Sequence, residues 1–235
     1  MRGYTACILA SASPARAATL RQAGIDPLIR VSAAEEEAVL AGFDPAYGIQ
    51  AQAKVRALAQ AKADAVIPTL RIDDIRTLAL RHGKPLPDHA VVVACDSMLE
   101  VGGELVGKPH SPAVARSRIR QLSGQTVTLH TGHAVVLLEL TEGSVKRGAQ
   151  RVDHVATQVH FTELTDAEID AYVATGEPLE VAGSFTIDGL GGPFIAGVTG
   201  DPHSVVGISL PLLRSIVTEL GVFWPSLWNC TNRAL

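Results

Sequence analysis

The sequence predicts an α/β fold, because strand-like and helix-like patterns alternate along the chain and a β-branched run near its middle has the composition of a buried strand. Its 235 residues can form one compact unit, or two closely packed lobes around a cleft, with a sizeable core. No repeat or low-complexity tract divides the chain. We therefore expect residues 1–235 to form a single domain.

The first expected strand leads directly into a helix. The apolar residues 6–10 end at Ser11, and Ser13 and Pro14 then supply an N-cap and a first helical residue. Gly24 suits the position just after the end of this helix. A strand that feeds a helix through the short segment SAS is therefore predicted.

A second strand and a long helix are expected next. Residues 27–31 form the strand, an acidic loop follows, and a helix rich in Ala, Gln and Lys runs from about 46 to 66. Residues 67–88 are polar and contain several prolines, so we expect a polar insertion there. The buried strand comes after it, over residues 90–96, and we expect it to end at Asp96.

The second half of the chain predicts a helix over 111–122 and then two long β-rich runs, 126–140 and 154–164. A turn-like segment at 142–150 separates the runs, so we expect them to pair antiparallel. The three elements that follow are a helix with a capping box from 165 to 176, a glycine-dense loop at 189–197 and an amphipathic helix over 210–220.

Composition and charge exclude several classes of protein. The formal net charge of −4 comes without a basic stripe, so we expect no nucleic-acid partner. No stretch approaches the roughly 20 apolar residues of a membrane span, and the apolar run near the N-terminus is too short for a signal peptide. We expect a cytoplasmic protein with no membrane partner. Cys7, Cys95 and Cys230 lack metal-type spacing, which favours reduced, buried thiols.

The start of the first helix is a candidate phosphate site. Ser11, Ser13 and Arg16 lie where free backbone N–H groups and the helix dipole favour an anion. The alternative is an ordinary Ser-Pro helix start with a solvent-facing Arg16.

Acidic residues provide a second part of the same chemistry. Asp96 follows the buried strand, where a carboxylate beside bound phosphates could ligate Mg²⁺ or take a proton from water; it could equally be a capping or turn residue. Glu36 belongs to the run Glu35–Glu37, which is typical of a solvated surface, although a metal-bridged polyphosphate needs a second carboxylate. Lys62 and Lys108 are ordinary surface lysines when viewed singly, yet each could offset phosphate charge. Together these residues predict a metal-assisted phosphate site.

Seven motifs, in order along nearly the whole chain, resemble those of the Maf family of septum-formation-inhibitor-like nucleotide pyrophosphatases. They are LASASPAR, EE at 35–36, ALAQAKADAV, CDSMLEVGGELVGKP, RQLSGQTVTLHTGHAVV, YVATGEPLEVAGSFTIDGLGGPFI and GDPHSVVGISLPLL. The resemblance implies an elongated α/β fold, similar to inosine triphosphatases, with a mixed, bent β-sheet flanked by helices and two lobes around a central cleft. It also implies hydrolysis of a nucleoside triphosphate, standard or modified, to a monophosphate and pyrophosphate, with Mg²⁺ or Mn²⁺ as cofactor and often a homodimer.

Carried over residue by residue, the resemblance assigns Asp96 as proton acceptor. It also assigns five further residues to contacts with the phosphates or the metal: Ser11, Arg16, Glu36, Lys62 and Lys108. Whether Asp96 acts as base, metal ligand or both stays open. The chain departs from the family at three substrate-selecting positions, where Ala15 replaces an arginine, Ser97 a threonine and Asp188 a glutamine.

Two rival interpretations remain at this point. A nucleotide-binding regulator of cell division could use the same phosphate site without turnover. A phosphatase with Cys95 as nucleophile is disfavoured, because no anion-cradling loop follows that residue.

Overall fold

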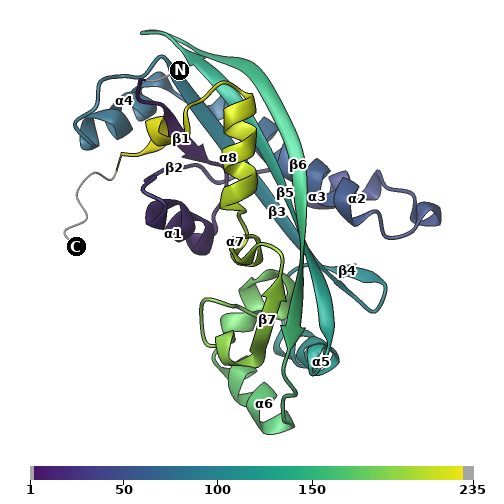
Figure 1. Cartoon of the computed structure of the whole chain (residues 1–235). Helices are drawn as coiled ribbons and strands as arrows, with labels where there is room; N and C mark the ends of the chain where they lie inside the picture. The colour runs from purple at the N-terminus through teal and green to yellow at the C-terminus, as the bar shows by residue number, and fades with distance from the viewer. Residues whose placement is uncertain (1–2, 230–235) are drawn as a thin grey trace.

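The computed structural model describes residues 3–229, which form a mixed, curled sheet with helices on both faces (Figure 1). In this part of the chain the sheet has seven strands in the order β2-β1-β3-β5-β6-β7, with β4 paired to β3. β1 is parallel to β2 and β3, and all other neighbours are antiparallel. The strands are β1 (Ala6–Leu9), β2 (Leu28–Ile29), β3 (His89–Val101), β4 (Glu104–Val106), β5 (Thr126–Leu140), β6 (Val145–Phe161) and β7 (Ile195–Thr199).

Eight α-helices surround this sheet within residues 3–229. They are α1 (Pro14–Gln22), α2 (Glu36–Ala41), α3 (Ala51–Val66), α4 (Ile72–Arg81), α5 (Pro112–Leu122), α6 (Asp166–Ala174), α7 (Pro202–Val206) and α8 (Leu210–Glu219). None of these helices combines the length and the apolar character that a membrane span requires.

The long strands β3, β5 and β6 run the length of the molecule, with helices near both of their ends and with α2 and α3 beside their middle (Figure 1). Helices α1, α4 and α8 lie at the end that contains β1, while α5 and α6 lie at the opposite end. The predicted mixed, bent sheet with flanking helices is therefore confirmed. The central cleft between two lobes stays a prediction.

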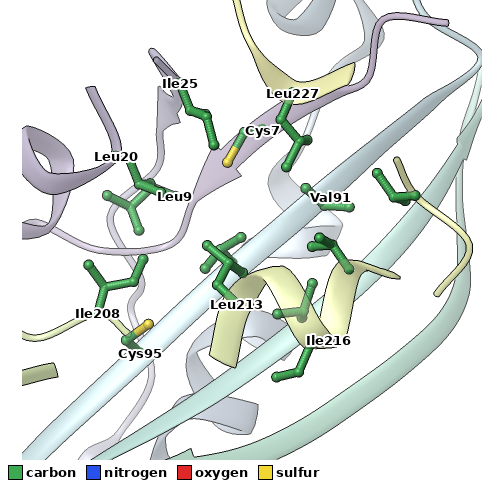
Figure 2. Close-up of a cluster of buried hydrophobic side chains, with 14 of the residues drawn as sticks. Cys7, Leu9, Leu20, Ile25, Val91, Cys95, Ile208, Leu213, Ile216 and Leu227 are labelled. Carbon is green, nitrogen blue, oxygen red and sulfur yellow. The ribbon is translucent and has the colours of Figure 1, made fainter. Parts of the chain in front are cut away.

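Side chains of β1 and β3 alternate between two hydrophobic clusters. On one face, Cys7, Leu9 and Val91 pack against α1 and α8 (Figure 2). On the other face, Ile8 and Val92 pack against α3 and α4. Because both faces are covered, this half of the sheet is apolar on both sides, which explains the continuous β-branched run in the sequence.

Most predicted helix starts and the antiparallel pairing of the two long strands are confirmed. Ser13, Ser111 and Thr165 each accept a backbone N–H bond as N-caps of α1, α5 and α6, and Thr165 forms the full capping box with Glu168. β5 and β6 pair antiparallel over nearly their whole length.

The prediction that Asp96 ends its strand is wrong. β3 continues to Val101, because β5 pairs with it residue by residue from His89 to Glu100. The apolar run in the sequence marks only the part of the strand that is buried on both faces. Asp96 therefore lies within a strand and does not open a loop.

Three other boundaries differ from the expectation. β6 begins at Val145, inside the predicted turn. In the described part of the chain, no strand pairs with the second edge of residues 145–153, and most of these residues are exposed, which is consistent with their polar side chains. The prediction of an acidic loop is wrong, because Glu36 is the first residue of α2. The long helix starts at Ala51, because Gly48 has a φ of 76° that interrupts helical geometry.

The segment 67–88, predicted to be a polar insertion, also contributes to the hydrophobic core. It contains α4, whose Ile75, Leu78 and Ala79 are fully or almost fully buried. Isoleucine and leucine at this spacing form one apolar helix face that covers the core. Whether the segment is an insertion stays a prediction.

At Gly132, β5 passes α3 with no side chain between them. A Cβ atom at Gly132 would lie closer than 3.0 Å to the carbonyl group of Val55 in α3. Gly132 is also directly opposite Asp96 in the β3–β5 ladder. The close approach of α3 to the sheet therefore occurs in the row that contains Asp96.

We predict that Gly132→Ala destabilises the protein by roughly 2–3 kcal/mol, because backbone atoms cannot yield as a flexible side chain can. Urea unfolding measures this loss. Gly197→Ala in β7 is the matched control, since no atom lies within 4 Å of its added Cβ. A similar loss in both variants would contradict the close-approach explanation.

Candidate active site

The candidate site lies where one edge of β3 has no strand beside it. β1 pairs with β3 as far as Val93, and β4 begins to pair with β3 at Leu99. Between these ladders, no strand within residues 3–229 covers this edge. Asp96 and Ser97 lie in the gap, and because successive residues of a strand point to opposite faces, they present one side chain to each face of the sheet.

On one face, Asp96 meets a lysine of α3. The Lys62 ammonium contacts the Asp96 carboxylate directly and lies 2.9 Å from Glu36 Oε1 at the start of α2. The side chains of Asp96 and Lys62 are only 10% and 13% exposed, whereas Glu36 is 52% exposed. Burial raises the pKa of Asp96, and the charges of Lys62 and Arg16 oppose that rise. The result is a nearly buried carboxylate in contact with a cation.

On the other face, three acceptors fix the guanidinium group of Arg16. Its Nε donates to the Gly207 carbonyl at 2.8 Å, Nη1 donates to Ser11 Oγ at 3.2 Å, and Nη2 donates to Ser97 Oγ at 3.2 Å. A Cβ atom at Gly207 would lie 3.0 Å from Arg16 Nε, so glycine provides the space for this contact. The alternative of a solvent-facing Arg16 is wrong.

The two serines at the start of α1 hold that helix end in place. Ser13 Oγ accepts the backbone N–H of Arg16 at 3.3 Å, and Ser11 Oγ accepts the backbone N–H of Ser13 at 3.1 Å. Together with Arg16, they concentrate hydrogen-bond donors at a helix N-terminus, which favours an anion.

A buried network of hydroxyl groups behind Ser97 was not anticipated from the sequence. Thr131 donates to the Ser204 carbonyl at 2.9 Å, so it accepts from Ser97 at 3.0 Å, and Ser97 in turn accepts from Arg16. Thr157 lies 2.7 Å from Ser204 Oγ. Threonine is common in strands, so neither Thr131 nor Thr157 carried a signal of this role.

His133 is a second buried polar residue that the sequence did not single out. Its Nε2 accepts the backbone N–H of Ser209 at 2.8 Å, which leaves the proton on Nδ1, 3.2 Å from the Thr131 carbonyl. Burial, reinforced by the charge of Arg16, lowers the pKa of His133 to about 4. The neutral ring therefore ties β5 to the N-cap of α8.

Three predicted site residues have no hydrogen bond or ion pair to this cluster within residues 3–229. Lys108 is half-exposed in the loop after β4, where it lies 3.6 Å from Glu180. Ala15 is on α1, and its carbonyl accepts a bond from Thr19 at 3.0 Å. Asp188 is exposed and makes no side-chain contact of either kind in the described part of the chain. The structure therefore leaves these three apart and brings the other predicted residues together in two groups, one on each face of β3: Glu36, Lys62 and Asp96, and Ser11, Ser13, Arg16 and Ser97.

The cysteines have the properties of core residues. Cys7 and Cys95 are free and buried, and burial raises the pKa of each thiol to about 12. A thiol of that kind is a poor nucleophile near neutral pH, so the Cys95 phosphatase interpretation is disfavoured further. Cys230 lies outside the described residues.

The predicted residues do not line the open groove at the far end of β3. That groove has a volume of about 610 Å³ and is bounded by Glu100, Gly103, Glu104, Gln125 and Thr128, among others. Among residues 3–229, no lysine or arginine lines it, so it is poorly suited to a polyphosphate.

Comparison with known proteins agrees with the motif series. The family model described as Maf-like protein matches residues 6–220. A nucleoside triphosphate pyrophosphatase of Saccharopolyspora erythraea is 52% identical over 224 residues, which are 94% of this chain and 96% of that protein. Proteins of the same name from Rhodococcus jostii and Nocardia farcinica are each 48% identical; these matches cover 97% and 94% of this chain and 99% and 96% of those proteins. This chain therefore belongs to the Maf-like protein family.

Proposed function

We propose that this chain hydrolyses nucleoside triphosphates between the α and β phosphates, releasing a nucleoside monophosphate and pyrophosphate. The observation that carries this proposal is the meeting of Asp96 and Lys62 on one side of an open strand edge with Arg16 and Ser11 on the other. The names of the relatives, which are nucleoside triphosphate pyrophosphatases, support the same reaction.

In this mechanism, Arg16 and the start of α1 bind and orient the phosphates. The guanidinium is held by three acceptors, so its remaining N–H groups and its charge are fixed before the substrate arrives. Preorganised donors of this kind stabilise developing negative charge without having to rearrange. Lys62 offsets charge from the other face of the sheet.

The Asp96 carboxylate acts as the general base. It accepts a proton from water as the water oxygen bonds to the α-phosphorus. The bond between that phosphorus and the bridging oxygen breaks, and its electrons leave with pyrophosphate. Burial gives Asp96 a higher proton affinity than a solvated aspartate, which suits it to this task, while contact with Lys62 favours its ionised form.

Glu36 and Asp96 would hold the divalent cation, Mg²⁺ or Mn²⁺. Both carboxylates contact the Lys62 ammonium, so they already face one cationic position. Within residues 3–229, no group of three or more His, Cys, Asp or Glu side chains could hold a metal. Two carboxylates nonetheless fit Mg²⁺, which is commonly bound through one or two carboxylates together with substrate phosphates. When bound, the cation would offset negative charge on those phosphates.

Asp188 is the candidate for base selection, together with Ala15 and Ser97. An ionised aspartate only accepts hydrogen bonds, so it favours bases that present N–H donors at the edge facing it, as guanine can, over bases that present a carbonyl at that edge. Its exposed carboxylate is available for such a contact.

We predict that Asp96→Asn lowers kcat by roughly 10²–10⁴-fold, because the amide cannot accept the proton. Nucleotide turnover with Mg²⁺, followed by separation of the products, measures both rate and cleavage position. Asp170→Asn, which removes a surface ion pair with Arg116, is the control and should keep its activity. Near-normal turnover in Asp96→Asn, or stepwise release of orthophosphate by the wild type, would refute the mechanism.

A second prediction concerns base preference. Asp188→Gln should lower kcat/KM for guanine nucleotides relative to thymine and uracil nucleotides, because the glutamine amide can donate to a base carbonyl. The measurement is kcat/KM over a panel of nucleoside triphosphates for both proteins. An unchanged ranking would remove Asp188 from base selection.

A further inference from the structure

The Glu177 carboxylate, just after α6, is the centre of the loop that carries Asp188. Its Oε1 accepts from the Tyr172 hydroxyl at 3.0 Å, from the Gly191 backbone at 3.1 Å and, at very short range, from the Thr186 hydroxyl. Its Oε2 accepts from the Leu190 backbone at 3.0 Å. One carboxylate therefore receives four hydrogen bonds, three of them from the segment 186–191.

The glycines of this segment allow it to fold closely around Glu177. A Cβ atom at Gly189 would lie 2.7 Å from Glu177 Oε2, and one at Gly191 would lie 2.6 Å from the Tyr172 hydroxyl. Here the backbone approaches a side chain that binds it.

A buried tyrosine of α6, Tyr172, helps to hold Glu177 in position. Tyr172 lies on α6, is 4% exposed, and its ring packs against Phe194 with centroids 5.5 Å apart. Its hydroxyl also accepts the backbone N–H of Thr186 at 3.1 Å. Although burial alone would raise the pKa of Glu177, the bonds from Thr186, Leu190, Tyr172 and Gly191 bring that pKa below its usual value. Glu177 is thus an ionised acceptor held at a fixed point.

Asp188 depends on this arrangement, because its own side chain makes no hydrogen bond or ion pair within residues 3–229. Its location follows from the backbone on either side, which Glu177 holds through Thr186, Leu190 and Gly191.

We propose that Glu177 is a positioning residue for base selection: it places Asp188 against the nucleobase by holding the segment 186–191. This inference rests on the proposed function and on the role of Asp188 given above. Within residues 3–229, Glu177 makes no hydrogen bond or ion pair with the residues assigned to the phosphates, so its effect falls on the choice of nucleotide and not on the phosphate chemistry.

The test is a double-mutant cycle with Glu177→Gln and Asp188→Asn. Glutamine keeps the size of the side chain, but its NH₂ group replaces one of the two acceptor oxygens. That NH₂ group would then face hydrogen-bond donors from which it cannot accept. We measure kcat/KM for guanine and thymine nucleoside triphosphates, and in parallel their equilibrium binding to each protein. Glu177→Gln should reduce the guanine-to-thymine selectivity ratio at least fivefold. In the Asp188→Asn background it should change that ratio less than twofold.

Two further variants separate positioning from general stability. Glu168→Ala removes the capping box of the same helix, so it should lower the melting temperature without changing selectivity. Thr186→Val removes one bond to Glu177 and should reduce selectivity in the same direction by a smaller factor, even if Glu177→Gln folds poorly.

An equal loss for all nucleotides, or an undiminished effect of Glu177→Gln in the Asp188→Asn background, would overturn the inference. Failure of the proposed function has a different signature. In that case the wild type would bind nucleotides without releasing pyrophosphate, and the binding ratios would still decide whether Glu177 positions Asp188.

Discussion

The close approach of α3 to β5 at Gly132 is the constraint on which the site depends. The missing side chain allows the α3 backbone to lie directly against the sheet, in the row that contains Asp96. α3 also carries Lys62, so this contact brings the lysine within reach of the Asp96 carboxylate. A larger residue at position 132 would push the helix away, and the carboxylate would then be left in a buried place without its partner. The packing of α3 at Gly132 and the Lys62–Asp96 ion pair therefore depend on each other.

A nearly buried carboxylate is costly unless opposite charges lie beside it. Asp96 has Lys62 in direct contact, and the charge of Arg16 also acts on it from the opposite face of the sheet. β1 pairs with β3 only as far as Val93, which leaves the edge of β3 open beside Asp96. Charged groups from both faces of the sheet can therefore act on the Asp96 carboxylate. Arg16, in turn, is held by a line of hydrogen bonds that passes through Ser97 and Thr131 to a backbone carbonyl. Other groups of the protein thus hold these charged side chains in place, as a preorganised site requires.

Local sequence signals predicted much of the fold, whereas features set by tertiary packing did not follow from them. Helix caps and glycine stops identified most helix ends, because capping depends on a few neighbouring residues. The polar strand 145–153 was missed because an edge strand exposed to water has the composition of a turn. The charged residues of the candidate site were predicted from their chemical types and motif order, but the part of Thr131 in the network was not, since threonine is common in strands. Neither the role of Gly132 nor the separation of Asp188 from the phosphate cluster could be foreseen, because each depends on how distant elements pack.

The most direct test of this account is a crystal structure with a nucleoside triphosphate analogue whose α,β-bridging oxygen is replaced by methylene, grown with Mn²⁺. The analogue cannot be cut at the proposed bond, and the anomalous signal of manganese locates the cation. We expect the phosphates beside Ser11, Arg16 and Lys62, with manganese bound to the Asp96 carboxylate. A triphosphate seated instead in the groove beside Glu100 and Gln125, with Asp96 and Lys62 unaltered, would contradict it.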